Sequence, residues 1–119
     1  MAIRVPTANA LVRDCLRLLA LRKVRAWRNN AGALGRNGQP VKGSKGSPDI
    51  LAILPAHRIL DLSYPPGRLL GVECKTGTGK LDADQRQWHE TARAAGVAVV
   101  VVRSFRELDD YLHSLGAFS

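Results

Sequence analysis

The chain is 119 residues long, and a chain of this length usually folds as one compact domain, so we expect a single domain over residues 1–119. No apolar run approaches the roughly 18 residues that a membrane-spanning helix needs, and the N-terminus lacks a signal peptide's apolar region. We therefore expect a soluble, cytoplasmic protein with no membrane partner. The net charge of +8 and the pI near 10.3 instead predict a polyanionic partner.

The positive charge is concentrated before Asp49. Asp14 is the only acidic residue in that part of the chain, which contains these basic residues: Arg4, Arg13, Arg17, Arg22, Lys23, Arg25, Arg28, Arg36, Lys42 and Lys45. They do not form one polar face opposite an aromatic face, so nucleic acid is favoured over a membrane surface. Charge alone does not identify the polyanion, and a solvated basic surface without a partner is the alternative.

The first part of the chain predicts a helix followed by strands. Thr7 suits a helix N-cap, and apolar residues then recur at helical spacing. In the short strand that follows, either Trp27 or Arg28 faces inward. The elements predicted here are a helix over 8–22, strands over 24–31, 49–54 and 68–75, and an exposed basic loop over 32–47.

The second part predicts a helix, a strand and a closing helix. Asp82 and Gln85 have the spacing of a capping box, which predicts a helix to about residue 95 that Gly96 ends. The β-branched run over 97–102 predicts a strand covered on both faces and parallel to the preceding one, because a helix connects them. The helix that ends near residue 95 carries Gln85, Trp88, Ala92 and Ala95 on one stripe. The helix over 105–115 is expected to face inward with Phe105, Leu108, Leu112 and Leu115.

Three ionisable residues interrupt segments that otherwise predict buried strands. Asp49 begins one such segment, and Glu73 and Lys75 lie two residues apart, hence on one face, in the next. If the two strands pair, the carboxylates converge as two hard oxygen ligands for Mg²⁺ or Mn²⁺, and Lys75 can orient a water and stabilise charge on a phosphate. Taken singly, a turn aspartate and an exposed Glu–Lys pair are the alternatives.

The spacing of Pro48-Asp49 and Glu73-Cys74-Lys75, in this order of elements, resembles the PD-(D/E)XK nuclease superfamily. The chain is also similar to the small stand-alone form of its VRR-NUC branch, through Arg28-Asn29-Asn30-Ala31-Gly32, Lys45-Gly46-Ser47-Pro48-Asp49, Gly77 and Leu81 through Gln85. The resemblance implies an α/β fold with a restriction-endonuclease-like αβββαβ core, in which helices flank a mixed central sheet, plus a C-terminal helix. It also implies a metal-dependent DNA endonuclease related to Holliday-junction resolvases.

The resemblance further implies roles for individual residues. Asp49, Glu73 and the backbone carbonyl of Cys74 would bind Mg²⁺ or Mn²⁺, and Asp49, Glu73, Lys75 and Gln85 would be catalytic. Gln85 has the helix cap as its alternative role. The family usually has a glutamate in the first helix; the matching residue is Asn9, which would ligate through its amide oxygen or a water, with Asp14 as a substitute.

The expected activity is hydrolysis of phosphodiester bonds in duplex or branched DNA, by a homodimer. The expected DNA-binding residues are Arg28, Asn30, Arg36, Lys42, Lys45 and Lys80. Because of Asn9, a weakly active or inactive DNA-binding domain of the same fold is the alternative, and a basic assembly module is a third. The histidines and cysteines lack zinc spacing, so both cysteines, like Trp27 and Trp88, are expected in the core.

Overall fold

The computed structural model describes residues 7–29, 45–55 and 68–116. Within these ranges the chain forms an α/β structure with three helices and a four-stranded mixed sheet. The elements are α1 (Ala8–Leu21), β1 (Arg25–Arg28), β2 (Ile50–Ile53), β3 (Leu69–Cys74), α2 (Ala83–Ala94), β4 (Ala98–Val102) and α3 (Phe105–Leu115). This order confirms the predicted sequence of helices and strands.

The strands lie in the order β1-β2-β3-β4. The first two pairings are antiparallel, and β3 pairs with β4 in parallel, in a register that runs from Leu70 opposite Ala98 to Cys74 opposite Val102. A parallel pair needs a long crossover connection, and α2 provides it. The predicted parallel pairing is therefore confirmed.

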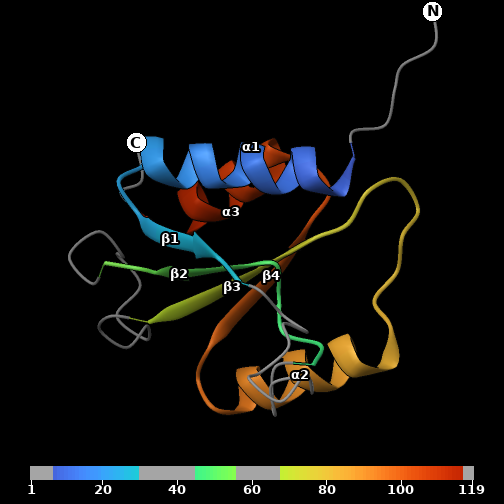
Figure 1. Cartoon of the computed structure of the whole chain (residues 1–119). Helices are drawn as coiled ribbons and strands as arrows, with labels where there is room; N and C mark the ends of the chain where they lie inside the picture. Colours follow the sequence, from blue (N-terminus) through green and yellow to red (C-terminus); the bar gives the residue numbers. More distant parts are fainter. Residues whose placement is uncertain (1–6, 30–44, 56–67, 117–119) are drawn as a thin grey trace, which may run out of the picture.

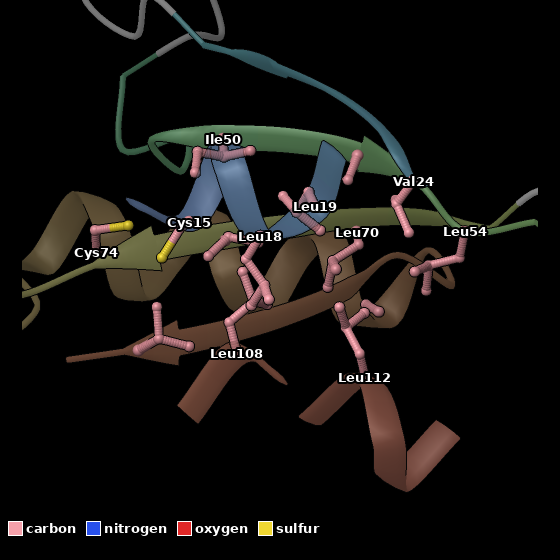
Figure 2. Packing of buried hydrophobic residues seen from close by; sticks show 14 of the residues in the cluster. Cys15, Leu18, Leu19, Val24, Ile50, Leu54, Leu70, Cys74, Leu108 and Leu112 are labelled. Carbon is pink, nitrogen blue, oxygen red and sulfur yellow. The ribbon is translucent and has the colours of Figure 1, made fainter. Parts of the chain in front are cut away.

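The helices cover both faces of the sheet (Figure 1). α1 and α3 pack together on one face, and α2 lies on the other face, next to β4. Figure 2 shows side chains of α1, the sheet and α3 gathered in one apolar cluster, including Leu18, Leu19, Ile50, Leu70, Leu108 and Leu112. Among the described residues, no helix is both long and apolar enough to span a membrane.

Both cysteines are buried free thiols, as predicted. Cys15 of α1 and Cys74 of β3 lie near one another at one side of this cluster (Figure 2). The Cys15 side chain and burial raise the pKa of the Cys74 thiol. Cys74 thus anchors the end of β3 in the core, immediately between the two charged residues Glu73 and Lys75.

Two aromatic residues lie differently from the prediction. Trp27 is 43% exposed, because β1 is an edge strand and it is Ala26 that packs against the core cluster. Phe105 is 45% exposed, because it starts α3 one turn before the buried stripe of Leu108, Leu112 and Leu115. The expectations that Trp27 is a core residue and that Phe105 faces inward were wrong.

β4 and α2 also differ in part. β4 is not fully covered on both faces, since Val100 and Val101 are only half-buried. The buried face of α2 consists of His89 and Ala92, with Gln85 and Trp88 half-buried, whereas Ala95 is the exposed C-cap residue beyond the last helical turn.

The ends of α2 follow the predicted signals. Asp82 accepts a hydrogen bond from the Gln85 backbone, and the Gln85 side chain accepts one from the Asp82 backbone, so the capping box is confirmed. Gly96 follows the helix with a φ of +94°. Gly46, with a φ of +84°, passes so close to this first turn that a Cβ would lie 2.3 Å from the backbone oxygen of Asp84.

Gly46→Ala should destabilise the protein more than Gly96→Ala does. Both substitutions place alanine at a positive φ, which costs roughly 1 kcal/mol, but only Gly46 lies against backbone atoms; a Cβ on Gly96 would meet nothing within 4 Å. Forcing apart the packed backbones at Gly46 should cost about 1–3 kcal/mol more in urea unfolding. Equal losses in the two variants would show that the close approach of Gly46 to α2 is not a real constraint.

Candidate functional site

The Pro48-Asp49 pair is held at the end of β2 by contacts on two sides. A Cβ on Gly71 would lie 2.6 Å from Cγ of Pro48, so the proline ring packs directly on the bare backbone of β3. On the other side, Nδ2 of Asn29 donates to Oγ of Ser47 at 2.8 Å and to the Pro48 carbonyl at 2.9 Å. These contacts place Asp49 at the end of the sheet.

Asp49 then connects the ends of β2 and β3. Its Oδ2 atom accepts a hydrogen bond from the backbone N–H of Cys74 at 2.8 Å. The backbone carbonyl of Asp49 accepts another from the N–H of Asn29 at 2.8 Å. Its backbone and its side chain are therefore both fixed, and the side chain reaches β3 next to Glu73.

Glu73 lies in β3 with a side chain that is only 2% exposed. Burial first, and then a hydrogen bond with the Asp49 carboxyl group and the charge of that group, together raise its pKa to about 8, although the charge of Lys75 partly opposes them. Two carboxyl groups that share one low-dielectric site do not both ionise easily. The pair therefore holds a proton at neutral pH in the absence of another cation.

Lys75 is held by Gln85. Its Nζ atom donates to Oε1 of Gln85 at 2.9 Å, and the same oxygen accepts from the backbone N–H of Asp82 at 3.0 Å. The two roles considered for Gln85 are thus compatible, since one amide oxygen caps α2 and positions Lys75. The start of α2 and the end of β3 are joined by this contact.

Asp49, Glu73 and Gln85 line one cleft of about 330 Å³, and Lys75 is connected to this lining through its hydrogen bond to Gln85. The lining includes two acidic residues to which the sequence assigned no role in the site, Asp82 and Asp84. Lys45 lies at the cleft with its Nζ atom 3.3 Å from Oδ2 of Asp84, an exposed pair of small energetic value. The lining residues are Lys45, Gly46, Ser47, Asp49, Glu73, Asp82, Asp84 and Gln85.

The donor set of the cleft suits a hard divalent cation. Asp49 and Glu73 offer carboxylate oxygens, and a divalent cation would relieve the repulsion that keeps a proton on this pair. The hydrogen bond from the Cys74 N–H to Asp49 fixes the backbone of Cys74 beside these carboxyl groups. In the described ranges, however, no group of three or more His, Cys, Asp or Glu side chains has the arrangement of a metal site.

The remaining predicted residues are more dispersed. Asn9 is exposed in the first turn of α1, and its Oδ1 atom accepts a hydrogen bond from the Arg28 guanidinium. Asp14 lines a separate hollow with Leu21 and Phe105, away from the cleft residues. Lys80 is exposed on the loop between β3 and α2. Asn30, Arg36 and Lys42 lie outside the described residues.

Sequence reasoning missed two residues that contact this site. Asn29 lies in the motif over residues 28–32 but had no predicted role, although its amide donates hydrogen bonds to Ser47 and Pro48. His89 had no assigned role, yet its buried ring lies with Nε2 3.4 Å from Oε1 of Glu73. The available signal was its position one helical turn after Gln85, on the same face of α2.

Glu73→Gln should remove a specific pH dependence of stability in the metal-free protein. The pKa of Glu73 is about 8 in the folded state and near 4.5 in an unfolded chain, so the folded state binds the extra proton between these values. This contribution is fully present below pH 4.5 and is lost as the pH rises through about 8, at up to about 1.4 kcal/mol per pH unit.

The measurement is urea unfolding in EDTA from pH 4 to pH 9, with wild type and Glu73→Gln compared at each pH. The free energy of unfolding of wild type should fall relative to that of the variant across this window. Parallel curves would contradict the raised pKa of Glu73.

Comparisons with models of protein families, with curated proteins and with solved structures found no match to this chain. The case for a function therefore depends on the described cleft: the paired carboxyl groups of Asp49 and Glu73, and Lys75 held by Gln85.

Proposed function

We propose that this chain is a Mg²⁺- or Mn²⁺-dependent DNA endonuclease with a restriction-endonuclease-like core. The observation that carries the proposal is the meeting of Asp49 and Glu73, which are distant in sequence, in one cleft beside Lys75. The order of helices and strands and the mixed sheet are compatible with that core. The basic net charge of +8 suits a DNA substrate.

The proposed metal ligands are Asp49, Glu73 and the backbone carbonyl of Cys74. The ion would supply Lewis-acid stabilisation of phosphate charge and a more acidic water. Asp49 is preorganised for this role, because the Cys74 N–H fixes one of its oxygens and leaves the other. Burial of Glu73 makes its ionised form dependent on a nearby cation, so it is suited to bind one.

Lys75 is proposed to bind the attacking water or a phosphate oxygen. Gln85 occupies one of the three N–H donors of its ammonium group, which leaves two for a water or a phosphate oxygen. In the hydrolysis, the water oxygen forms a bond to phosphorus while the bond from phosphorus to one nucleotide oxygen breaks. A positioned cation stabilises the negative charge that develops on the phosphoryl oxygens in this step.

The DNA backbone is proposed to contact the residues that the sequence predicts for this role. Lys45 lines the cleft, and Arg28 and Lys80 are exposed. Asn30, Arg36 and Lys42 complete the proposed contact set. A branched DNA substrate and a homodimer belong to the same proposal, through the resemblance to resolvase-like nucleases; a two-fold dimer would match a two-fold junction.

Asn9 favours a second candidate, a DNA-binding domain of the same fold with weak or no cleavage. Its amide oxygen is neutral and already accepts a hydrogen bond from Arg28. Such an oxygen is a poorer ligand for Mg²⁺ than a carboxylate, so two acidic ligands alone would hold the ion weakly. The two candidates differ in cleavage and agree in salt-sensitive DNA binding.

The test is cleavage of linear, flapped and four-way DNA in Mg²⁺ or Mn²⁺. Wild type should cut at least one substrate, and Asp49→Asn, Glu73→Gln and Lys75→Met should each lose roughly 100-fold or more in rate. Arg106→Ala is the matched control, because it removes an exposed positive charge from α3, on the sheet face opposite α2, and should leave the rate unchanged.

Gel shifts without a divalent metal separate the remaining outcomes. Wild type that binds DNA in a salt-sensitive manner but cuts no substrate with either metal would support the binding domain instead of the nuclease. Wild type that neither cuts nor binds these DNAs would exclude both candidates.

A further inference from the structure

His89 is buried in α2 and contacts the key carboxyl group of the cleft. Its side chain is 1% exposed, and its Nε2 atom lies 3.4 Å from Oε1 of Glu73. It is absent from the lining of the cleft, so it approaches Glu73 from within the protein rather than from the substrate side. The contact joins the middle of α2 to β3, across the face of the sheet that α2 covers (Figure 1).

The polar atoms of this contact have no other partner. In the described part of the chain, Oε1 of Glu73 and both ring nitrogens of His89 are buried without a hydrogen bond. A buried polar atom without a hydrogen bond is destabilising, and an apolar side chain would fill the same place without that cost. The placement of an imidazole here therefore needs a reason beyond packing of α2.

We propose that His89 is a positioning residue that orients the Glu73 carboxylate for a divalent cation, through a hydrogen bond from Nε2–H to Oε1. This deepens the proposed function and rests on it. The separation of 3.4 Å is slightly beyond a good hydrogen bond, so a small shift of either side chain forms it. The bond fixes one oxygen of Glu73 and leaves the other for the ion.

The imidazole of His89 is placed to donate to Glu73, because its ring is buried and its Nε2 atom faces the carboxyl group. An imidazole ring donates through its N–H group, and among the described residues the acidic oxygen beside Nε2 is Oε1 of Glu73. Carboxylate ligands are commonly held by such a donor, and its loss typically costs 10–100-fold in metal affinity or activity.

The test compares His89→Gln with His89→Asn in the full-length chain. The two side chains carry the same amide and differ by one methylene, so the glutamine nitrogen reaches the place of Nε2 and the asparagine nitrogen only that of Nδ1. Binding of Mn²⁺ is measured directly by electron paramagnetic resonance of the free ion, without DNA. His89→Gln should bind Mn²⁺ nearly as wild type does, and His89→Asn should bind about 10-fold or more weakly.

Ala92→Gly controls for damage to α2. Ala92 is the other buried residue of this helix, and glycine there should destabilise the helix without changing the contact with Glu73. Its Mn²⁺ affinity should equal that of wild type. A loss in Ala92→Gly as large as that in His89→Asn would mean that affinity only reports stability, and would overturn the proposal.

The other outcomes are distinct. Wild type and His89→Asn with equal Mn²⁺ affinity, or equal losses in His89→Asn and His89→Gln, would overturn the role of His89 and leave the proposed function standing. Wild type that binds no Mn²⁺ would overturn the metal-dependent function, and this inference with it.

Discussion

The hydrogen bond from the Cys74 N–H to the Asp49 carboxylate is the contact on which the site depends. It joins the start of one strand to the end of its neighbour, and it needs Pro48 to pack closely on the bare backbone of Gly71. Asn29, the residue after β1, completes the arrangement through its hydrogen bonds to Ser47 and Pro48. Asp49 is thereby brought beside Glu73, although neither strand alone would hold two carboxyl groups together.

The cost of this arrangement falls on Glu73. A carboxyl group that is 2% exposed beside a second one is unfavourable in its ionised form, which is why its pKa rises to about 8. The apolar cluster on the opposite face of the sheet, with α1 and α3, offsets that cost. The ionised form of Glu73 is unfavourable here, and a bound cation would make it favourable. Such a conflict between stability and local chemistry is typical of functional sites.

The main contribution of α2 is to position residues of this site rather than to build the apolar core. Its first turn caps the helix and holds Lys75 through Gln85, and one turn later His89 contacts Glu73. Gly46 allows the segment before Asp49 to pass against the same first turn. The helix thus brings together the ends of β2 and β3 on the side of the sheet away from α1 and α3 (Figure 1).

The order of elements, the capping box at Asp82 and Gln85, and the parallel pairing of β3 and β4 were determined by local patterns, because apolar periodicity and cap chemistry act over a few residues. The exposure of Trp27 and Phe105 was not determined by such patterns, because it depends on the position of the strand in the sheet and on how the helix is rotated against its neighbours. The motifs indicated Asp49, Glu73, Lys75 and Gln85, but only the tertiary structure joined them and added Asn29 and His89. Those contacts cross from one element to another, and a linear pattern carries no distance between side chains that packing alone brings together.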